Sequence, residues 1–180
     1  AAVIVLWFLF CYPNSRVVTT APIFKQVRNL LWREIRARFA AAELNGTPLG
    51  GTLNTTDLQI DAEWFAVGLS TKDPIAFQGH HAEHMLFVAD EASGIAQEIY
   101  DAAEGFLTSD HARVLLIGNP NQTSGQFYDC FTKQKRMWNC IAISAFDSPN
   151  FTGEKMPDRI LRRLVNRRYV VDAQEKWGDT

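Results

Sequence analysis

The fold is decided by the stretch Met85-Leu86-Phe87-Val88-Ala89-Asp90-Glu91. Five consecutive apolar residues bounded by polar ones predict a strand buried on both faces of a sheet. Two carboxylates follow at its carboxyl end, where open α/β sheets bind ligands. There Asp90 can hold Mg²⁺, directly or through water, and Glu91 can orient or deprotonate a water that attacks a phosphate. The alternative is an ordinary strand followed by an acidic loop.

A second strand end supports phosphate chemistry. The apolar run 114–117 leads directly into Gly118-Asn119-Pro120. A polar side chain at the tip of a neighbouring strand can sense the γ-phosphate, and glycine allows a close approach of backbone. We therefore predict Asn119 and Gly118 as part of the site. The alternative is a turn that simply favours Gly, Asn and Pro.

The rest of the chain alternates between strand and helix patterns. Further strands are expected at 16–20, 58–60, 64–69, 114–117 and 140–143, with 58–69 as a hairpin. Helices are expected at 1–10 (buried), 24–39, 95–106, 127–131 and 158–169, with Pro157 as the first residue of the last one. Alternating strands and helices predict an α/β fold with helices on both faces of the sheet.

The charge is unevenly distributed along the chain. The whole sequence has a net charge of −2, but residues 57–110 hold eleven acids and one base, and the remainder holds seventeen bases and nine acids. The overall balance excludes a uniformly basic nucleic-acid coat, whereas the segregation predicts one surface that could hold a polyanion. Two solvated faces that merely differ in charge are the alternative.

Cysteine usage and the first residues restrict the class of protein. Cys11, Cys130 and Cys140 form no C-x-x-C pair, which argues against a disulfide scaffold or a thiolate zinc site and fits a reducing cytosol. The ten apolar residues at the start fall short of the ~20 that a membrane span needs, so no membrane partner is predicted. Lacking an initial Met, the chain is expected to be a fragment.

Three motifs together resemble a known family. They are Val17-Val18-Thr19-Thr20-Ala21-Pro22 with Gln26-Val27, then Phe87-Val88-Ala89-Asp90-Glu91-Ala92-Ser93-Gly94, then Ile117-Gly118-Asn119-Pro120. Their order and spacing resemble the ATPase domain of large terminase subunits, the DNA-packaging motors of tailed bacteriophages and prophages. The resemblance covers nearly the whole chain. It implies a P-loop NTPase core of the ASCE or RecA-like type, with three layers and a mainly parallel sheet.

The same resemblance implies roles for the site residues. Asp90 and Glu91 would be the Walker B pair, with Asp90 on Mg²⁺ and Glu91 catalytic. Gly118 and Asn119 would stand at the coupling motif, with Gly118 beside bound ATP and Asn119 linking phosphate release to movement. Residues 1–150 would be the core of a partial ATPase domain spanning 1–180, and 151–180 a lid or linker toward a nuclease domain.

The chain also departs from the family pattern. No G-x-x-x-x-G-K-[ST] phosphate loop occurs in the 180 residues, and residues 71–84 contain no arginine that could act on a neighbouring subunit's ATP. By the resemblance, the first strand and phosphate loop would precede Ala1 and the nuclease domain would follow Thr180. We therefore expect the 180-residue chain to be inactive alone.

DNA contacts are expected on two basic helical segments. By the resemblance, Thr20-Ala21-Pro22 would be the strand end that related helicases use near DNA, so Thr20 and the nearby Gln26 are expected DNA contacts. Arg28 lies on the polar face of the following helix. Arg163 and Arg167 share a stripe of the helix expected at 158–169. A solvated basic face, or a lid or linker, is the alternative for that last helix.

The resemblance implies a function for the whole protein. ATP hydrolysis would drive double-stranded DNA into a procapsid, with the portal protein and small terminase subunit as partners, in a homo-oligomeric ring in the bacterial host cytoplasm. Another nucleic-acid-dependent P-loop ATPase, such as a helicase, is one alternative. A non-catalytic prophage remnant is the other.

Zinc chemistry is not predicted. His80-His81-Ala82-Glu83-His84 matches H-x-x-E-H, but it stands too close to the strand at Met85 for the helix that this motif requires. His81-Ala82-Glu83 matches H-x-E of zinc deaminases, yet no P-C-x-x-C follows. Hydrogen-bonding histidines near a subunit or nucleotide interface are the favoured interpretation.

Overall fold

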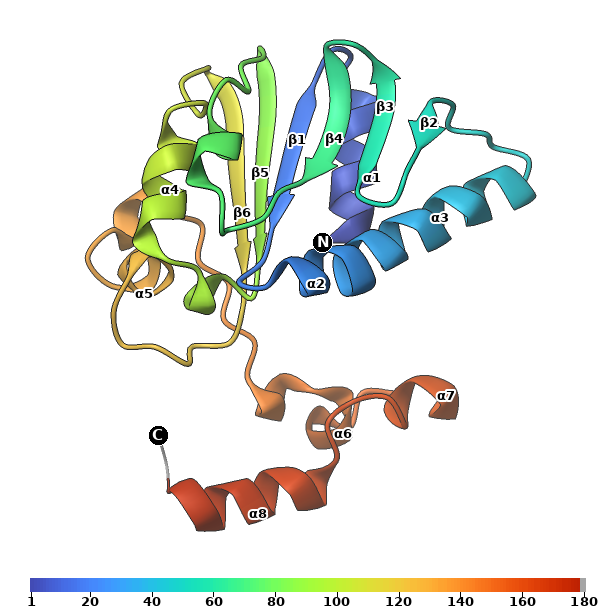
Figure 1. Ribbon diagram of the computed structural model, residues 1–180. Coiled ribbons are helices and arrows are strands. Elements are labelled where there is room, and N and C mark those ends of the chain that lie inside the picture. Colours follow the sequence, from blue (N-terminus) through green and yellow to red (C-terminus); the bar gives the residue numbers. More distant parts are fainter. Residues whose placement is uncertain (179–180) are drawn as a thin grey trace. The chain divides into compact units, whose positions relative to one another are not determined.

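The computed structural model describes residues 1–178, which divide into two compact units. The first comprises Ala1–Trp138, and the second begins at Asn139. The first unit is an α/β structure in which helices cover a twisted sheet, drawn in blue to light orange in Figure 1. The predicted α/β class is thus confirmed, and each unit is described by itself below.

Six strands form one sheet within the described residues, in the order β2-β3-β4-β1-β5-β6. Strands β4, β1, β5 and β6 run parallel, whereas β2 and β3 are antiparallel additions at one side. Their bounds are β1 Arg16–Thr20, β2 Thr52–Leu53, β3 Asp57–Asp61, β4 Trp64–Gly68, β5 His84–Asp90 and β6 His111–Ile117. The mainly parallel sheet and the hairpin are therefore as predicted.

Strand β5 lies between β1 and β6 at the centre of the parallel part. Met85 through Ala89 are all buried, as the uninterrupted apolar run predicts for a strand covered on both faces. Thr20 pairs with Ala89, and Asp90 pairs with Ile117. The carboxyl ends of three parallel strands therefore meet at one edge of the sheet.

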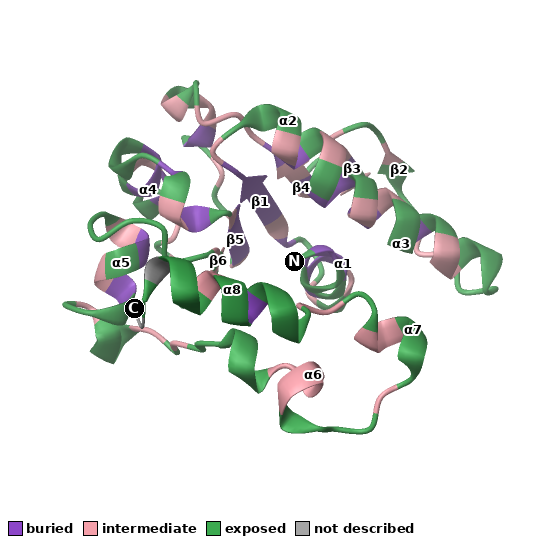
Figure 2. Cartoon of the chain, turned by 90° about the horizontal axis from the view of Figure 1, so that it is seen from below, coloured by how far each residue is buried: buried purple, intermediate pink, exposed green. Residues whose placement is uncertain are grey.

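Two apolar clusters cover the two faces of the sheet. Helix α1 (Ala2–Cys11) and the long helical segment that ends at Leu44 pack on one face, around Leu9, Trp32 and Ile35. Helix α4 (Gln97–Glu104) packs on the other, where Ile99 and Phe106 join Phe77 and Phe87. Figure 2 shows the buried strands β1 and β5, in purple, between α4 on one side and α1 and α3 on the other.

The helix predicted at 24–39 is one helical segment with an irregular first part. It consists of α2 (Phe24–Gln26), a π-helical turn η1 (Val27–Leu31) and α3 (Trp32–Leu44). The Trp32 indole donates to Thr19 Oγ1 at 2.9 Å, and a Cβ on Gly68 would meet that indole nitrogen at 2.6 Å. The wide turn therefore coincides with the place where a buried tryptophan packs closely onto the sheet.

Helix α1 forms as predicted but is buried on one side only. Val5 and Leu9 are fully buried, whereas Val3 and Trp7 are 64% and 53% exposed. The sequence-based expectation of a buried helix was wrong for this second face, because an all-apolar run has no polar stripe to show which side faces the sheet.

Shorter elements complete the first unit. The expected helices at 95–106 and 127–131 appear as α4 and as α5 (Gln126–Phe131). Short 3₁₀ turns lie at η2 (Pro74–Phe77), η3 (Ala92–Gly94) and η4 (Lys135–Met137). Helix α5 contributes Phe127 to the same apolar cluster as α4.

The second unit corrects two predictions, the first being the strand at 140–143. These residues form no strand, and Ile141 and Ile143 are 70% and 84% exposed. A β-branched run favours extended backbone, but a strand also needs a partner strand, and residues 140–143 pair with none in the described part of the chain.

The single helix predicted at 158–169 is also wrong. The structure has α7 (Asp158–Leu161) and α8 (Arg167–Trp177), with Pro157 before the first helical residue. Asn166 caps α8 by accepting from the Tyr169 N–H at 2.8 Å, and Asn150 Nδ2 donates to the Leu161 and Val165 carbonyls. These side chains satisfy backbone groups that a continuous helix would pair internally. The unit also contains η5 (Ala145–Asp147) and α6 (Pro149–Thr152).

The histidines lie at the amino-terminal side of β5, away from Asp90. His80 bonds the Ala76 carbonyl at 3.1 Å and lies beside Phe106, and its burial lowers the pKa of the imidazole. The His84 ring stacks between Tyr12 and His111. No group of three metal-ligating side chains occurs within residues 1–178. No helix in that range is long and apolar enough to cross a membrane.

Candidate functional site

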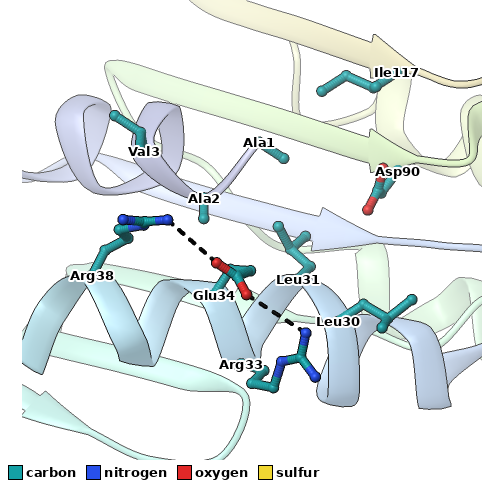
Figure 3. A pocket seen from close by; sticks show the side chains of 10 residues that line it. All are labelled: Ala1, Ala2, Val3, Leu30, Leu31, Arg33, Glu34, Arg38, Asp90 and Ile117. Atoms are coloured by element: carbon teal, nitrogen blue, oxygen red, sulfur yellow. Dashed lines mark ion pairs between the residues drawn. The ribbon is translucent and has the colours of Figure 1, made fainter. Parts of the chain in front are cut away.

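A cavity of about 390 Å³ opens where the parallel strands end. The first turn of α1, the turn of η1, Asp90 and Ile117 line it, as Figure 3 shows. Arg33 and Arg38 also line it, and both are paired with Glu34 at 3.6 Å. The cavity therefore combines two arginines, their partner Glu34 and an aspartate at the edge where open α/β sheets place their ligands.

Asp90 stands at the last position of β5. Its side chain is partly buried and lies at the end of its strand, beside the end of β6 (Figure 3). A carboxylate is the oxygen ligand that Mg²⁺ takes singly or in pairs, with waters and phosphates completing its octahedron. Asp90 thus fits a magnesium ligand chemically, and its neighbours leave space for water.

Glu91 adopts a left-handed backbone conformation, with φ 52° and ψ 43°. This conformation is uncommon for a residue with a side chain and marks a turn imposed by its surroundings. Tyr100 supplies one constraint, because its hydroxyl donates to the Ala92 carbonyl at 2.7 Å. Burial raises the pKa of that phenol well above its ordinary value, so the group stays a hydrogen-bond donor.

Gly118 supplies the second constraint on this turn. A Cβ at Gly118 would lie 3.0 Å from the Ala92 nitrogen and 3.4 Å from the Glu91 carbonyl carbon. The end of β6 therefore packs on the backbone beside Glu91 at a distance that only glycine allows without a shift. The next residue, Asn119, is exposed, and its carbonyl accepts from the Asn121 N–H at 2.8 Å. The structure thus brings all four predicted residues, Asp90, Glu91, Gly118 and Asn119, to one sheet edge.

Gln26 also belongs to this edge. Its Nε2 donates to Glu91 Oε2 at 3.2 Å, across 65 positions of sequence. The sequence pointed to Gln26 only as a DNA contact and missed this bond. The sequence does show a glutamine after one strand and a carboxylate after another. That the two side chains pair could be predicted only once these strands were known to be neighbours.

The other predicted DNA contacts have different surroundings. Thr20 is fully buried, and its hydroxyl donates to the Leu69 carbonyl at 3.0 Å. Arg28 is exposed and lines a second cavity, of about 670 Å³, together with Arg36. Asn29, Leu53, Asn54 and Thr55 complete its lining, so this cavity lies between the long helical segment and the loop from β2 to β3.

Arg163 and Arg167 belong to the second unit. Arg163 is exposed in the break between α7 and α8, and Arg167 begins α8. The Arg167 Nε donates to the Asn150 carbonyl at 2.6 Å, and its guanidinium lies 5.6 Å from the centre of the Phe151 ring. The helical stripe expected to join these arginines is therefore interrupted.

Comparison with known proteins confirms the predicted resemblance. The chain is 28% identical over 135 residues to a probable terminase large subunit of Enterobacteria phage P7, and the match covers 71% of the chain. Its structure is similar to the large terminase ATPase domain of Thermus phage P74-26, with a TM-score of 0.57, 19% identity, and coverage of 72% of this chain and 57% of that one. It is also similar to the large terminase of a second, thermophilic bacteriophage, with a TM-score of 0.51, 15% identity, and coverage of 66% and 30%.

The comparisons bear on the fold of the chain and on how much of a longer relative it spans. The solved structures show that the part of the chain they match has the fold of a terminase ATPase domain. The chain spans about a quarter, 27%, of the length of the curated relative it matches. No protein-family model matches the sequence.

Proposed function

We propose that this chain is the part of a phage large terminase ATPase that holds Mg²⁺ and activates the attacking water. The observation that carries the proposal is the pair Asp90 and Glu91 at the carboxyl end of the central buried strand, where Asp90 lines a cavity. The similarity to large terminases supports it independently. A helicase-like ATPase would share this pair, whereas a folded remnant without activity would need none of the strained geometry at Glu91.

The proposed chemistry divides between the two carboxylates. Bound ATP and Mg²⁺ would supply the reacting phosphate and the positive charge that stabilises its transfer. Asp90 would hold the ion at the cavity wall. Glu91 would accept a hydrogen bond, and then the proton, from the water that attacks the γ-phosphate. Asn119 would contact the γ-phosphate. When that phosphate leaves, Asn119 would transmit the change through Gly118 to the turn at Glu91.

These residues provide only part of a complete site. The printed sequence contains no G-x-x-x-x-G-K-[ST] loop, so the groups that cradle the β- and γ-phosphates would come from outside the 180 residues. The first turn of α1 lines the cavity. A phosphate loop would therefore have to reach the cavity beside Ala2 and Ile117.

Mg²⁺-dependent ATP hydrolysis tests the proposed function. In phosphoryl transfer, positioning and electrostatics supply nearly all the catalysis, so we expect the 180-residue chain to show no turnover above background. The whole protein encoded by the same reading frame is expected to hydrolyse ATP, and chelation of Mg²⁺ is expected to abolish that activity. A whole protein that lacks Mg²⁺-dependent hydrolysis would contradict the proposal.

The whole protein would use this hydrolysis to package double-stranded DNA into a procapsid. In that setting its partners would be the portal protein and the small terminase subunit, in a homo-oligomeric ring in the bacterial host cytoplasm. Residues 151–180 would serve as a lid or linker. The similarity to large terminases supports these assignments.

The cavity lined by Arg28 and Arg36 is the proposed place of DNA contact in the first unit. Neither arginine has an ion-pair partner within residues 1–178, whereas Arg33 and Arg38 on the same helical segment both pair with Glu34. Arg36 donates to the Thr55 carbonyl, which holds its guanidinium at the cavity wall. Two unneutralised arginines beside asparagine and threonine side chains suit a phosphate backbone, whose contacts carry no base specificity.

Charge removal in this cavity is expected to weaken DNA binding in a salt-dependent way. For Arg28→Gln and Arg36→Gln, binding of duplex DNA is measured at several salt concentrations on the whole protein. Each change should lower the slope of log affinity against log salt by about one, regardless of base sequence. Lys133→Gln, which removes a charge already paired with Asp129 at 3.1 Å, is the matched control. Slopes equal to wild type in both arginine variants would place the DNA elsewhere.

A further inference from the structure

The side-chain amide of Gln26 connects two parts of the candidate site. Its Nε2 donates to Glu91 Oε2 at 3.2 Å, and its Oε1 accepts from the Ile23 backbone N–H at 3.1 Å. Both ends of the amide are therefore engaged, which fixes the flip state in which nitrogen faces the carboxylate. Within residues 1–178 this is the sole hydrogen bond described for the Glu91 carboxylate.

The segment that carries Gln26 is itself firmly placed. Thr71 Oγ1 donates to the Pro22 carbonyl at 3.0 Å, and a Cβ on Gly94 would lie 2.9 Å from Pro22 Cγ. The loop after β1 thus packs directly against the turn that follows Glu91. On the other side of Gln26, Val27 is fully buried and begins the π-helical turn. The backbone that carries the Gln26 amide is therefore held close to Glu91 by packing on both sides.

Glu91 needs such a partner because its side chain is long and exposed. An unpartnered glutamate distributes over several rotamers, and only a few of them would face an attacking water. A neutral amide donor can fix one carboxylate oxygen while leaving the other available to water. A cationic partner in the same place would pair with the carboxylate and make its oxygens less able to accept a proton from water.

We propose that Gln26 is a positioning residue that holds the Glu91 carboxylate in its water-activating orientation. This inference rests on the proposed ATPase function and assigns Gln26 a role inside the site in addition to the DNA contact expected from the sequence. It links the strand end after β1 to the carboxylate after β5. Gln26 touches neither nucleotide nor water in this role and acts through Glu91.

The first test is the variant Gln26→Met, which keeps the length of the side chain and removes both hydrogen bonds. On the whole protein we expect kcat for Mg²⁺-ATP hydrolysis to fall about five- to tenfold, with KM and nucleotide affinity unchanged. Thermal unfolding should match wild type. An unchanged kcat, or a loss that appears only in KM or in thermal stability, would overturn the inference.

Gln26→Glu separates positioning from packing. It keeps the shape and the acceptor for the Ile23 N–H but replaces the amide donor with a second carboxylate. If Gln26 acts through its donor, kcat at neutral pH falls at least as far as in Gln26→Met, because like charges push Glu91 out of its orientation. If Gln26 only fills space, Gln26→Glu keeps kcat close to wild type, and the inference fails.

Gln97 provides the matched control. Its Nε2 also donates to a carboxylate, Asp101 Oδ1 at 3.0 Å, on the exposed face of α4. Gln97→Met is expected to keep wild-type kcat. A fall as large as that of Gln26→Met would mean that loss of any such bond disturbs the fold, and the positioning role would be refuted.

A readout independent of activity separates this inference from the proposed function. In the whole protein, Gln26→Met should shift the ¹³C resonance of the Glu91 carboxylate, and Gln97→Met should not. An unshifted resonance would refute the contact whether or not the protein hydrolyses ATP. Conversely, a shifted resonance in a protein whose whole form lacks ATPase activity would refute the proposed function and with it the positioning role.

Discussion

Replacing Glu91 with glutamine is expected to reduce Mg²⁺-dependent ATP hydrolysis by the whole protein by about 100-fold or more. The amide keeps the shape of the side chain, and its oxygen can still accept the hydrogen bond from Gln26 Nε2. It is far less basic than a carboxylate and cannot take the proton of an attacking water. ATP should therefore still bind, because the change removes an interaction made in the transition state.

Binding and turnover are measured separately to check this expectation. Nucleotide affinity is determined with a fluorescent ATP analogue, and turnover by phosphate release at saturating ATP. Glu104→Gln, the same change at an exposed position of α4, is the control and should behave like wild type. Wild-type turnover in Glu91→Gln would remove Glu91 from the mechanism and the Walker B assignment with it.

The second large effect is expected on stability, from Phe87→Ala. Phe87 is 1% exposed in the middle of β5, three positions before Asp90, and its ring packs edge-on against Phe77 and Phe106. Truncation removes a buried aromatic ring and leaves a cavity that rigid neighbours on two sides cannot fill. The free energy of unfolding should fall by about 3–5 kcal/mol.

Urea unfolding of the 180-residue chain, followed by circular dichroism, measures this loss. Phe131→Ala is the control, because Phe131 is 37% exposed and contacts mainly Phe127. Its cost should be about 1 kcal/mol or less. Equal losses in the two variants would show that the apolar layer around β5 does not dominate the stability of the first unit.

Local sequence determined the four parallel strands, the α/β class and the residues at the carboxyl end of β5. An apolar run such as 85–89 can be buried only between two covering layers, so its position and its following carboxylates are visible without a structure. The Gly-Asn pair after 114–117 was visible for the same reason. The motifs at these strand ends also supported the resemblance to large terminases, which the comparisons confirm.

Where the sequence failed, the deciding interaction was distant or competed with a local pattern. Residues 140–143 have the composition of a strand but pair with no other strand in the described chain. Residues 158–169 have helical periodicity, yet Asn150 and Asn166 take up the backbone groups at the break. The periodic pattern of apolar residues does not reveal such competing side-chain hydrogen bonds.

Only the tertiary structure decided how the site is held together. The left-handed turn at Glu91 depends on a tyrosine nine positions later and on Gly118 from the neighbouring strand. The bond from Gln26 to Glu91 depends on β1 lying beside β5, which their separation in sequence does not reveal. The local sequence shows which residue types stand at the strand ends. The strand order decides how close these residues lie to one another, because hydrogen-bonded strand pairing brings remote segments together.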